Sequence, residues 1–209
     1  MKSNNIAEYK YLKKNYTLII LPIISFLGGI WQGQYTDDGY HWGFIFSNAL
    51  NLIDGKEPYN EIFIQYGFFS TLLNSLVLYI FKKNIISLIF LTSFFYSLSI
   101  YFIGILTQKF TLNKYYAFLS TLIIFLIYPW PTTPWPYFQA FFFSILFCFF
   151  YSYNKRKYSI YSGVSLALAL LSFTTVYNFI LLFFIFFVIF FLLLSYKKIS
   201  NDFIKKNIY

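Results

Sequence analysis

The chain has 209 residues, of which 59% are hydrophobic, 26% aromatic and only 11% charged. This is too little polar surface to cover a water-soluble globule of this size, and the apolar residues lie in blocks between short lysine-bearing breaks. The formal charge of +9 does not indicate nucleic-acid binding, because the 16 lysines and arginines are scattered at segment ends and form no stripe. We therefore predict an all-α, polytopic membrane helix bundle with membrane lipid as its partner.

Six apolar segments are candidates for helices that cross the membrane. In chain order they are Thr17 to Trp31, Gly67 to Phe81, Ile85 to Thr107, Tyr115 to Tyr128, Phe138 to Tyr153 and Tyr158 to Tyr196. The last is long enough for two crossings of about 20 residues each, with Thr174 to Asn178 as the bend. The first follows four lysines, as in a signal peptide, but the residues after Trp31 form a poor cleavage site and an uncleaved span is expected. The total is six or seven crossings.

The positions of the basic residues decide between these two numbers, because lysine and arginine in short loops stay on the cytoplasmic side. If Gly67 to Phe81 crosses the membrane, 6 of the 16 basic residues are cytoplasmic and 10 are outside. If this segment lies along the outer surface, 13 are cytoplasmic and only Lys56, Lys82 and Lys83 are outside. The second arrangement is favoured, and a run of this length is more often interfacial or re-entrant than spanning.

The prediction is a single transmembrane domain over residues 1–209, with both termini in the cytoplasm. The expected spans are 16–31, 85–107, 115–128, 137–153, 158–175 and 178–196, followed by a cytoplasmic tail over 197–209. Lysine-rich, arginine-poor usage indicates an AT-rich genome, so we expect a multi-pass protein of a bacterial inner (plasma) membrane.

The long outer loop, residues 32–84, holds five of the seven acidic residues and the only histidine. The acids are Asp37, Asp38, Asp54, Glu57 and Glu61. Membrane orientation places few demands on acids and does not explain this concentration. They are either solvated loop charges or, in the case of the Asp37-Asp38 pair just after a span, groups that act as a base or bind a metal.

Two helices parallel to the membrane are expected in this loop, near residues 41–53 and 67–82. The first has apolar residues at helical spacing, namely Trp42, Ile45 or Phe46, Ala49, and Leu52 or Ile53. The other face is predicted to carry Ser47, Asn48 and Asn51. Gly55 suits a left-handed position that ends this helix.

A series of short motifs runs through the loop in a fixed order. They are Asp37-Asp38-Gly39-Tyr40-His41-Trp42-Gly43, a helix with Asn48-Ala49, Gly55-Lys56-Glu57-Pro58-Tyr59, Glu61-Ile62-Phe63 and Gln65-Tyr66-Gly67. This ordered spacing over about thirty residues resembles the first outer loop of GT-C glycosyltransferases. It is most similar to the bacterial relatives of the dolichyl-phosphate-mannose protein mannosyltransferases and of the lipid A aminoarabinose transferase. The resemblance implies a GT-C-like N-terminal module.

The resemblance also implies an activity, the transfer of a sugar from a polyprenyl-phosphate donor to a cell-surface glycan, lipid or protein acceptor on the outer face. In this family an early acid of the loop is the base that deprotonates the acceptor, which gives the role to Asp37 or Asp38. The leaving phosphate needs nearby positive charge or a divalent cation. Lys56 is the candidate for the phosphate, with ordinary snorkelling as an equal alternative. Asp38 and Glu61 are candidate ligands for Mg²⁺ or Mn²⁺.

The remaining candidates are aromatic or imidazole groups. His41 is a candidate substrate-binding or acid-base group, with a packed or hydrogen-bonded structural residue as the alternative. Tyr59 and Tyr66 either line an acceptor or sugar site or belong to an aromatic belt at the membrane interface. The second outer segment, Pro129 to Tyr137, cannot be helical because of its prolines and is expected to form a rigid aromatic cap that lacks an acid.

GT-C enzymes usually continue through several spans beyond the six predicted here. The chain is therefore expected to be the N-terminal half of a split or truncated enzyme, or a small relative that works with a second membrane subunit. The alternative function is a non-catalytic GT-C-like or accessory membrane protein of surface-polysaccharide assembly. A transporter ranks last, because the middles of the predicted spans carry no acidic or basic residue.

Overall fold

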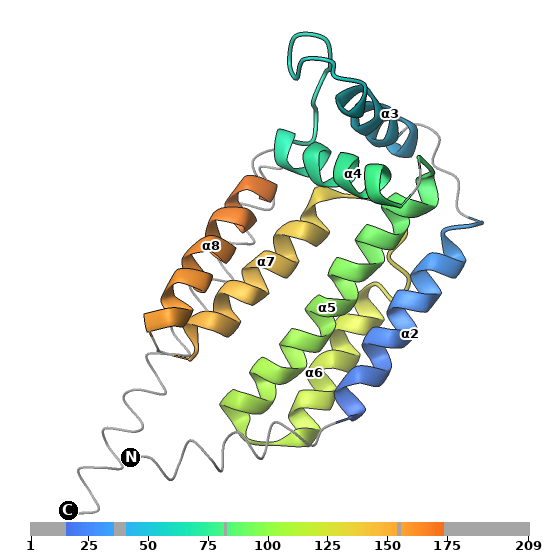
Figure 1. The fold of residues 1–209 in the computed structure, drawn as a ribbon. Helices are drawn as coiled ribbons and strands as arrows, with labels where there is room; N and C mark the ends of the chain where they lie inside the picture. The colour runs from blue at the N-terminus through green and yellow to red at the C-terminus, as the bar shows by residue number, and fades with distance from the viewer. Residues whose placement is uncertain (1–15, 36–40, 82, 154–155, 174–209) are drawn as a thin grey trace, which may run out of the picture. The chain divides into compact units, whose positions relative to one another are not determined.

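The computed structural model describes residues 16–35, 41–81, 83–153 and 156–173, and in this part of the chain the fold is all-α, as predicted (Figure 1). Its helices are α2 (Thr17–Gln32), α3 (His41–Ile53), α4 (Phe68–Ile80), α5 (Ile85–Thr111), α6 (Lys114–Ile127), α7 (Pro136–Tyr151) and α8 (Arg156–Phe173). All seven belong to one compact unit. The bend predicted at Thr174 and the span predicted over 178–196 lie outside the described residues.

The local sequence explains where several helices begin and end. Asn84 and Asn113 precede α5 and α6, and their side chains accept hydrogen bonds from Ile86 N at 3.1 Å and Tyr115 N at 2.8 Å. Such caps satisfy amide groups that the first turn leaves without a partner. Gly55 follows α3 with a φ of 83°, so the predicted left-handed end is confirmed.

The lengths of these helices bear on the predicted crossings. By length and composition, α5 is the one helix among the described residues that is long and apolar enough to cross a membrane. The other apolar helices are shorter. For example, the 14 residues of α6 cover about 21 Å at 1.5 Å per residue, less than the ~30 Å of a hydrocarbon core. Six crossings therefore remain a prediction.

The helices predicted as spans run alongside one another, whereas α3 and α4 lie across one end of them (Figure 1). This end contains the last residues of α2 and the first residues of α5 and α7. Ile45 and Ala49 of α3 form a buried cluster there with Leu78 of α4 and Leu88 of α5. Helix α5 thus contributes both to the bundle and to the layer above it.

Helix α2 packs through small residues and exposes large ones. Ser25, Gly29 and Gly33 recur at every fourth position, and an added Cβ at Gly29 would lie 3.0 Å from Pro131 O. The opposite side exposes large apolar residues, among them Ile20, Ile23 and Leu27. Small residues between helices and large ones outside are typical of packing within a bilayer.

Helix α4 also exposes large apolar residues, and the residues that it buries are mostly polar. Its buried residues are Ser70, Thr71, Asn74, Ser75 and Leu78, so four of the five are polar. Leu76, Tyr79 and Ile80 are exposed, with Tyr79 at 77%. A helix on the surface of a water-soluble protein has the opposite arrangement. Polar groups of α4 therefore point into the molecule, where they line the cleft described below.

The segment between α6 and α7 is non-helical, as predicted, but α7 begins at Pro136, so the prediction was wrong for Pro136 and Tyr137, because proline is accepted in the first turn of a helix. The segment also lies deeper than a surface cap. Pro129 O accepts a hydrogen bond from Ser25 Oγ of α2 at 3.0 Å, and Pro131 O accepts one from Ser93 Oγ of α5 at 2.9 Å. Pro131 and Pro134 are buried, whereas Trp130 is exposed. The predicted cap position was therefore wrong, because serine hydroxyls on two helices satisfy these carbonyls and let the segment enter the bundle.

Candidate functional site

Three aromatic or imidazole side chains from distant parts of the sequence meet at the end of the bundle that α3 and α4 cover. His41 Nδ1 and the Tyr66 hydroxyl are hydrogen-bonded at 2.9 Å. The Trp135 ring packs against both, with centroid distances of 4.8 Å to His41 and 5.1 Å to Tyr66. We call these residues the His41 cluster. It joins the start of α3, the residue before the α4 cap and the segment before α7.

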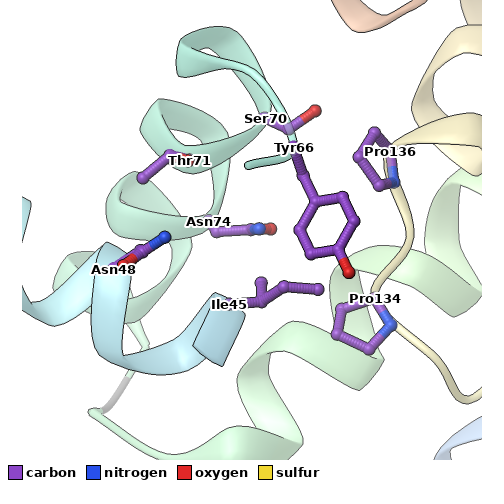
Figure 2. Close-up of a pocket in the computed structure, with 8 residues that line it drawn as sticks. All are labelled: Ile45, Asn48, Tyr66, Ser70, Thr71, Asn74, Pro134 and Pro136. Carbon is purple, nitrogen blue, oxygen red and sulfur yellow. The ribbon is translucent and has the colours of Figure 1, made fainter. Parts of the chain in front are cut away.

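A small cleft lies beside this cluster, between α3, α4 and the segment before α7 (Figure 2). Its lining residues are Ile45, Asn48, Tyr66, Ser70, Thr71, Asn74, Pro134 and Pro136. None of these residues is charged. Its free internal volume is about 10 Å³, which is room for about one water molecule.

The polar groups of the cleft are held at defined positions. Ser70 Oγ donates to Gln139 Oε1 of α7 at 2.8 Å, and both residues are buried. Asn48 Nδ2 donates to Phe63 O at 2.8 Å, which ties α3 to the segment before α4. Asn74 is only 3% exposed and points toward the Tyr66 ring (Figure 2). These contacts fix the walls of the cleft from three different elements.

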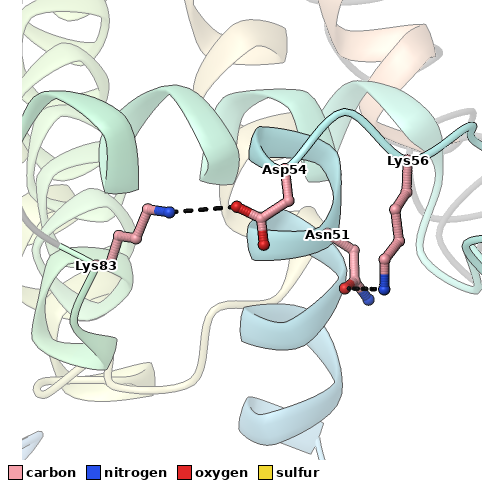
Figure 3. Close-up of polar contacts among 4 residues, drawn as sticks. All are labelled: Asn51, Asp54, Lys56 and Lys83. Carbon is pink, nitrogen blue, oxygen red and sulfur yellow. Dashed lines mark hydrogen bonds and ion pairs between the residues drawn. The ribbon is translucent and has the colours of Figure 1, made fainter.

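The charged residues after α3 form a separate group (Figure 3). Lys83 Nζ lies 3.3 Å from Asp54 Oδ1 in an exposed ion pair, and Lys56 Nζ donates to Asn51 Oδ1 at 2.9 Å. The ion pair connects the end of α3 to the residues before α5, whereas the Lys56 contact stays within the end of α3. Both are exposed to solvent and are worth little stability individually.

The turn after Lys56 is held by its own carboxylates. Glu61 Oε2 accepts a hydrogen bond from Glu57 N at 2.8 Å, and Glu57 Oε2 accepts one from Asn60 at 2.9 Å. Tyr59, in the same turn, is exposed and has a φ of 66°. Within the described residues, no group of three or more His, Cys, Asp or Glu side chains is close enough to hold a metal ion.

The structure thus places the predicted site residues at two locations. His41 and Tyr66 are in the cluster, whereas Lys56, Tyr59 and Glu61 lie beyond the other end of α3. The 13 residues of α3 separate these locations by about 18 Å at 1.5 Å per residue. Asp37 and Asp38, the predicted catalytic pair, lie outside the described residues.

Sequence reasoning placed Asn48 on the polar, outward face of its helix, and this was wrong. Asn48 is 7% exposed, because the Phe63 carbonyl needs its amide as a donor. The polar residues of α4 were not singled out at all. The signal that would have found them is the spacing of Ser70, Thr71, Asn74 and Ser75, which puts every polar residue of an apolar run on one helical face.

Comparisons with known proteins give no family for this chain: no family model, no curated protein and no solved structure matches it. The chemistry of the site therefore has to be argued from its own residues. The arrangement offers an imidazole, a phenol and an indole in contact, and the phenol of Tyr66 also lines the uncharged cleft. Aromatic rings beside hydroxyl and amide groups offer both apolar contact and hydrogen bonds to a polar group.

Proposed function

We propose that this chain is the N-terminal module of a GT-C-type membrane glycosyltransferase, which moves a sugar from a polyprenyl-phosphate donor to an acceptor on the outer face of a bacterial inner membrane. One observation carries the proposal. The His41 cluster joins the helix start that follows the Asp37-Asp38 pair to Tyr66 of the same predicted outer loop and to Trp135 of the second predicted outer segment, beside an uncharged polar cleft.

The distribution of polarity supports a membrane location. Large apolar residues are exposed on α2, α4 and α6, while serine, threonine and glycine lie between the helices. Exposing this much apolar side chain to water would be unfavourable, whereas lipid accepts it. The two crosswise helices, α3 and α4, then belong to the outer surface of the bilayer, as the lysine positions predict.

The proposed reaction needs a base close to the acceptor hydroxyl. Asp38 precedes His41 by three residues, a length of chain that spans at most about 11 Å. A carboxylate there removes the hydroxyl proton as the acceptor oxygen attacks the sugar, and the C–O bond to the lipid phosphate breaks. Lys56, the candidate for the leaving phosphate, lies at the far end of α3. Its alternative role is that of an exposed structural lysine.

The proposal is tested with membranes that contain the full chain, a labelled polyprenyl-phosphate sugar and native membrane acceptors. Loss of a general base lowers rates by about 10²–10⁴-fold, so Asp37→Asn or Asp38→Asn should reduce transfer by such a factor. Asp54→Asn is the matched control, because Asp54 is in the same loop and its side chain makes an exposed ion pair with Lys83. Its transfer rate should remain within about two-fold of wild type.

Two results would contradict this function. Transfer that persists when both carboxylates are replaced excludes the assigned base. Transfer that never appears, with any polyprenyl-phosphate sugar and with the product of the adjacent reading frame present, favours an accessory protein of polysaccharide assembly.

A further inference from the structure

Helices α2 and α6 begin at the same end of the bundle and pack against each other (Figure 1). Between residues 18 and 30 of α2 and between residues 117 and 127 of α6, every exposed side chain is apolar. The large ones are Ile19, Ile20, Ile23, Ile24 and Leu27 of α2, and Phe118, Leu119, Ile123, Leu126 and Ile127 of α6. We call this surface the α2–α6 face. Water solvates such a surface poorly, whereas the acyl chains of a lipid suit it.

Exposed tyrosine and tryptophan side chains lie at both ends of this face. They are Tyr16, Tyr115 and Tyr116 where both helices begin, and Trp31 and Trp130 at the opposite end. Lys114, directly before Tyr115, is exposed as well. Tyrosine and tryptophan collect at the two membrane–water interfaces, where the ring contacts lipid and its polar group contacts water. The two aromatic groups therefore mark the two borders of the acyl-chain region.

These borders are closer together than the borders of an ordinary bilayer. From Tyr16 to Trp31 the chain rises about 22 Å at 1.5 Å per residue, whereas the hydrocarbon core of a typical bilayer is ~30 Å thick. A tilted helix covers less of the bilayer thickness, so a tilt would increase this difference.

Packing fixes the tryptophan border in place. The Trp130 ring occupies the space that a Cβ of residue 28 would need, and it meets the Phe125 ring edge-on at 5.8 Å. The Trp31 ring meets Tyr35 at 5.4 Å. Helix α5 is long enough for an ordinary bilayer, but it packs against α2, α6 and α7 through its buried residues. The shorter helices α2 and α6 therefore set the thickness that this face requires.

We propose that the α2–α6 face binds phospholipids with short acyl chains, in a bilayer that is locally about 8 Å thinner than usual. The proposal rests on the membrane location given under the proposed function, and not on sugar transfer. Longer lipids have to compress or bend their chains beside this face, at a free-energy cost that grows with the mismatch. Lipids whose chains match the face avoid this cost and are preferred.

The test is a lipid competition with the full chain in phosphatidylcholine vesicles. A brominated phosphatidylcholine quenches the fluorescence of tryptophans that contact lipid, and unbrominated lipids compete with it for the protein surface. The competitors are dimyristoleoyl, dioleoyl and dierucoyl phosphatidylcholine, in order of increasing chain length. Dimyristoleoyl phosphatidylcholine should bind at least about two-fold more strongly than the dioleoyl lipid, and the dierucoyl lipid should bind most weakly. The thermal unfolding midpoint should follow the same order.

A double variant checks that the signal comes from this face. Trp31 and Trp130 are exposed, whereas Trp42 is 4% exposed and Trp135 packs in the His41 cluster. Trp31→Phe combined with Trp130→Phe should therefore remove most of the quenching by brominated lipid.

The border itself is tested by lengthening the aliphatic part of the face. Replacing Tyr16, Tyr115 and Tyr116 together by leucine removes the border at one end and should shift the preference toward dioleoyl phosphatidylcholine. Phe63→Leu is the matched control, because Phe63 is an exposed aromatic residue in the loop before α4 and lies outside the face. Its preference should equal that of the wild type.

Several outcomes overturn the short-chain preference. They are equal binding of all three lipids, strongest binding of the dioleoyl or dierucoyl lipid, or quenching that is unchanged in the double tryptophan variant, in which case a second copy or another protein covers the face. A chain that enters no bilayer overturns both this proposal and the membrane location. Sugar transfer with strongest binding of the dioleoyl lipid retains the enzyme and overturns the preference. A short-chain preference without any sugar transfer retains the preference and overturns the enzyme.

Discussion

At the scale of single residues, Lys109 shows how a charge is accommodated inside the helical bundle. It is near the end of α5 and only 9% exposed. Its ammonium group donates to Ser152 O at 2.8 Å and Ser152 Oγ at 3.0 Å, and lies 3.4 Å from the centre of the Tyr153 ring. Ser152 directly follows α7, so the positive charge meets the negative end of that helix dipole.

Replacing this lysine should therefore destabilise the protein without affecting the site at the other end. Lys109→Met removes charge-assisted hydrogen bonds, which contribute about 1.5–3 kcal/mol each to stability. We expect the free energy of unfolding to fall by about 2 kcal/mol, as measured by denaturant titration in detergent. Lys114→Met is the control, since Lys114 is exposed at the start of α6. Equal stability of the two variants would contradict a structural role of Lys109.

At the scale of helices, the sequence predicted where helices begin and end more accurately than which side of each helix is buried. The bounds 41–53 coincide with those of α3, because apolar residues recur at helical spacing and Gly55 ends the run. The count of basic residues on each side of the membrane favoured a helix near 67–82 that lies along the surface instead of crossing. Helix α4 is in this segment and lies across the end of the other helices (Figure 1). Neither argument indicated that the polar side of α4 faces inward, because periodicity shows that a helix has two faces and not which one is buried.

The segment before α7 was misjudged for a related reason. Its prolines correctly predicted a non-helical backbone, but depth depends on whether partners exist for its carbonyl groups. Those partners are Ser25 and Ser93, which precede the carbonyl groups that they contact by 104 and 38 residues. The proximity of His41, Tyr66 and Trp135 depends on the same long-range packing and could not be derived from their spacing.

The glycines of α2 allow a prediction about helix packing. Gly29 approaches Pro131 O so closely that an added Cβ would lie 3.0 Å from it. Gly29→Leu forces α2 away from α5 and from the segment before α7, and overpacking of this kind costs about 1–3 kcal/mol or more. The thermal midpoint should fall and the segment should become more sensitive to protease. Gly43→Ala is the control, because nothing lies within 4 Å of its added Cβ. A destabilisation of Gly43→Ala equal to that of Gly29→Leu would contradict this account.

At the scale of the whole molecule, the two ends of α5 contribute to different features. The end next to α3 and α4 carries the His41 cluster and the cleft, whereas the opposite end carries the contact between Lys109 and Ser152. The proposed topology places the first end outside the cell and the second in the cytoplasm. This assignment depends on α4 lying along the surface, since a crossing by α4 would reverse every later segment.

Cysteine labelling tests that topology directly. Cys148 is the only cysteine and is buried in α7, so Cys148→Ala provides a background in which single cysteines are introduced. Phe81 and Thr111 are exposed residues at either end of α5. In the six-span arrangement Phe81→Cys reacts with a membrane-impermeant maleimide in intact spheroplasts, and Thr111→Cys reacts only after permeabilisation. If α4 crossed the membrane, the two results would be exchanged. Asn60→Cys, in the exposed turn before α4, should react from outside in both arrangements and confirms that the label reaches the outer loop.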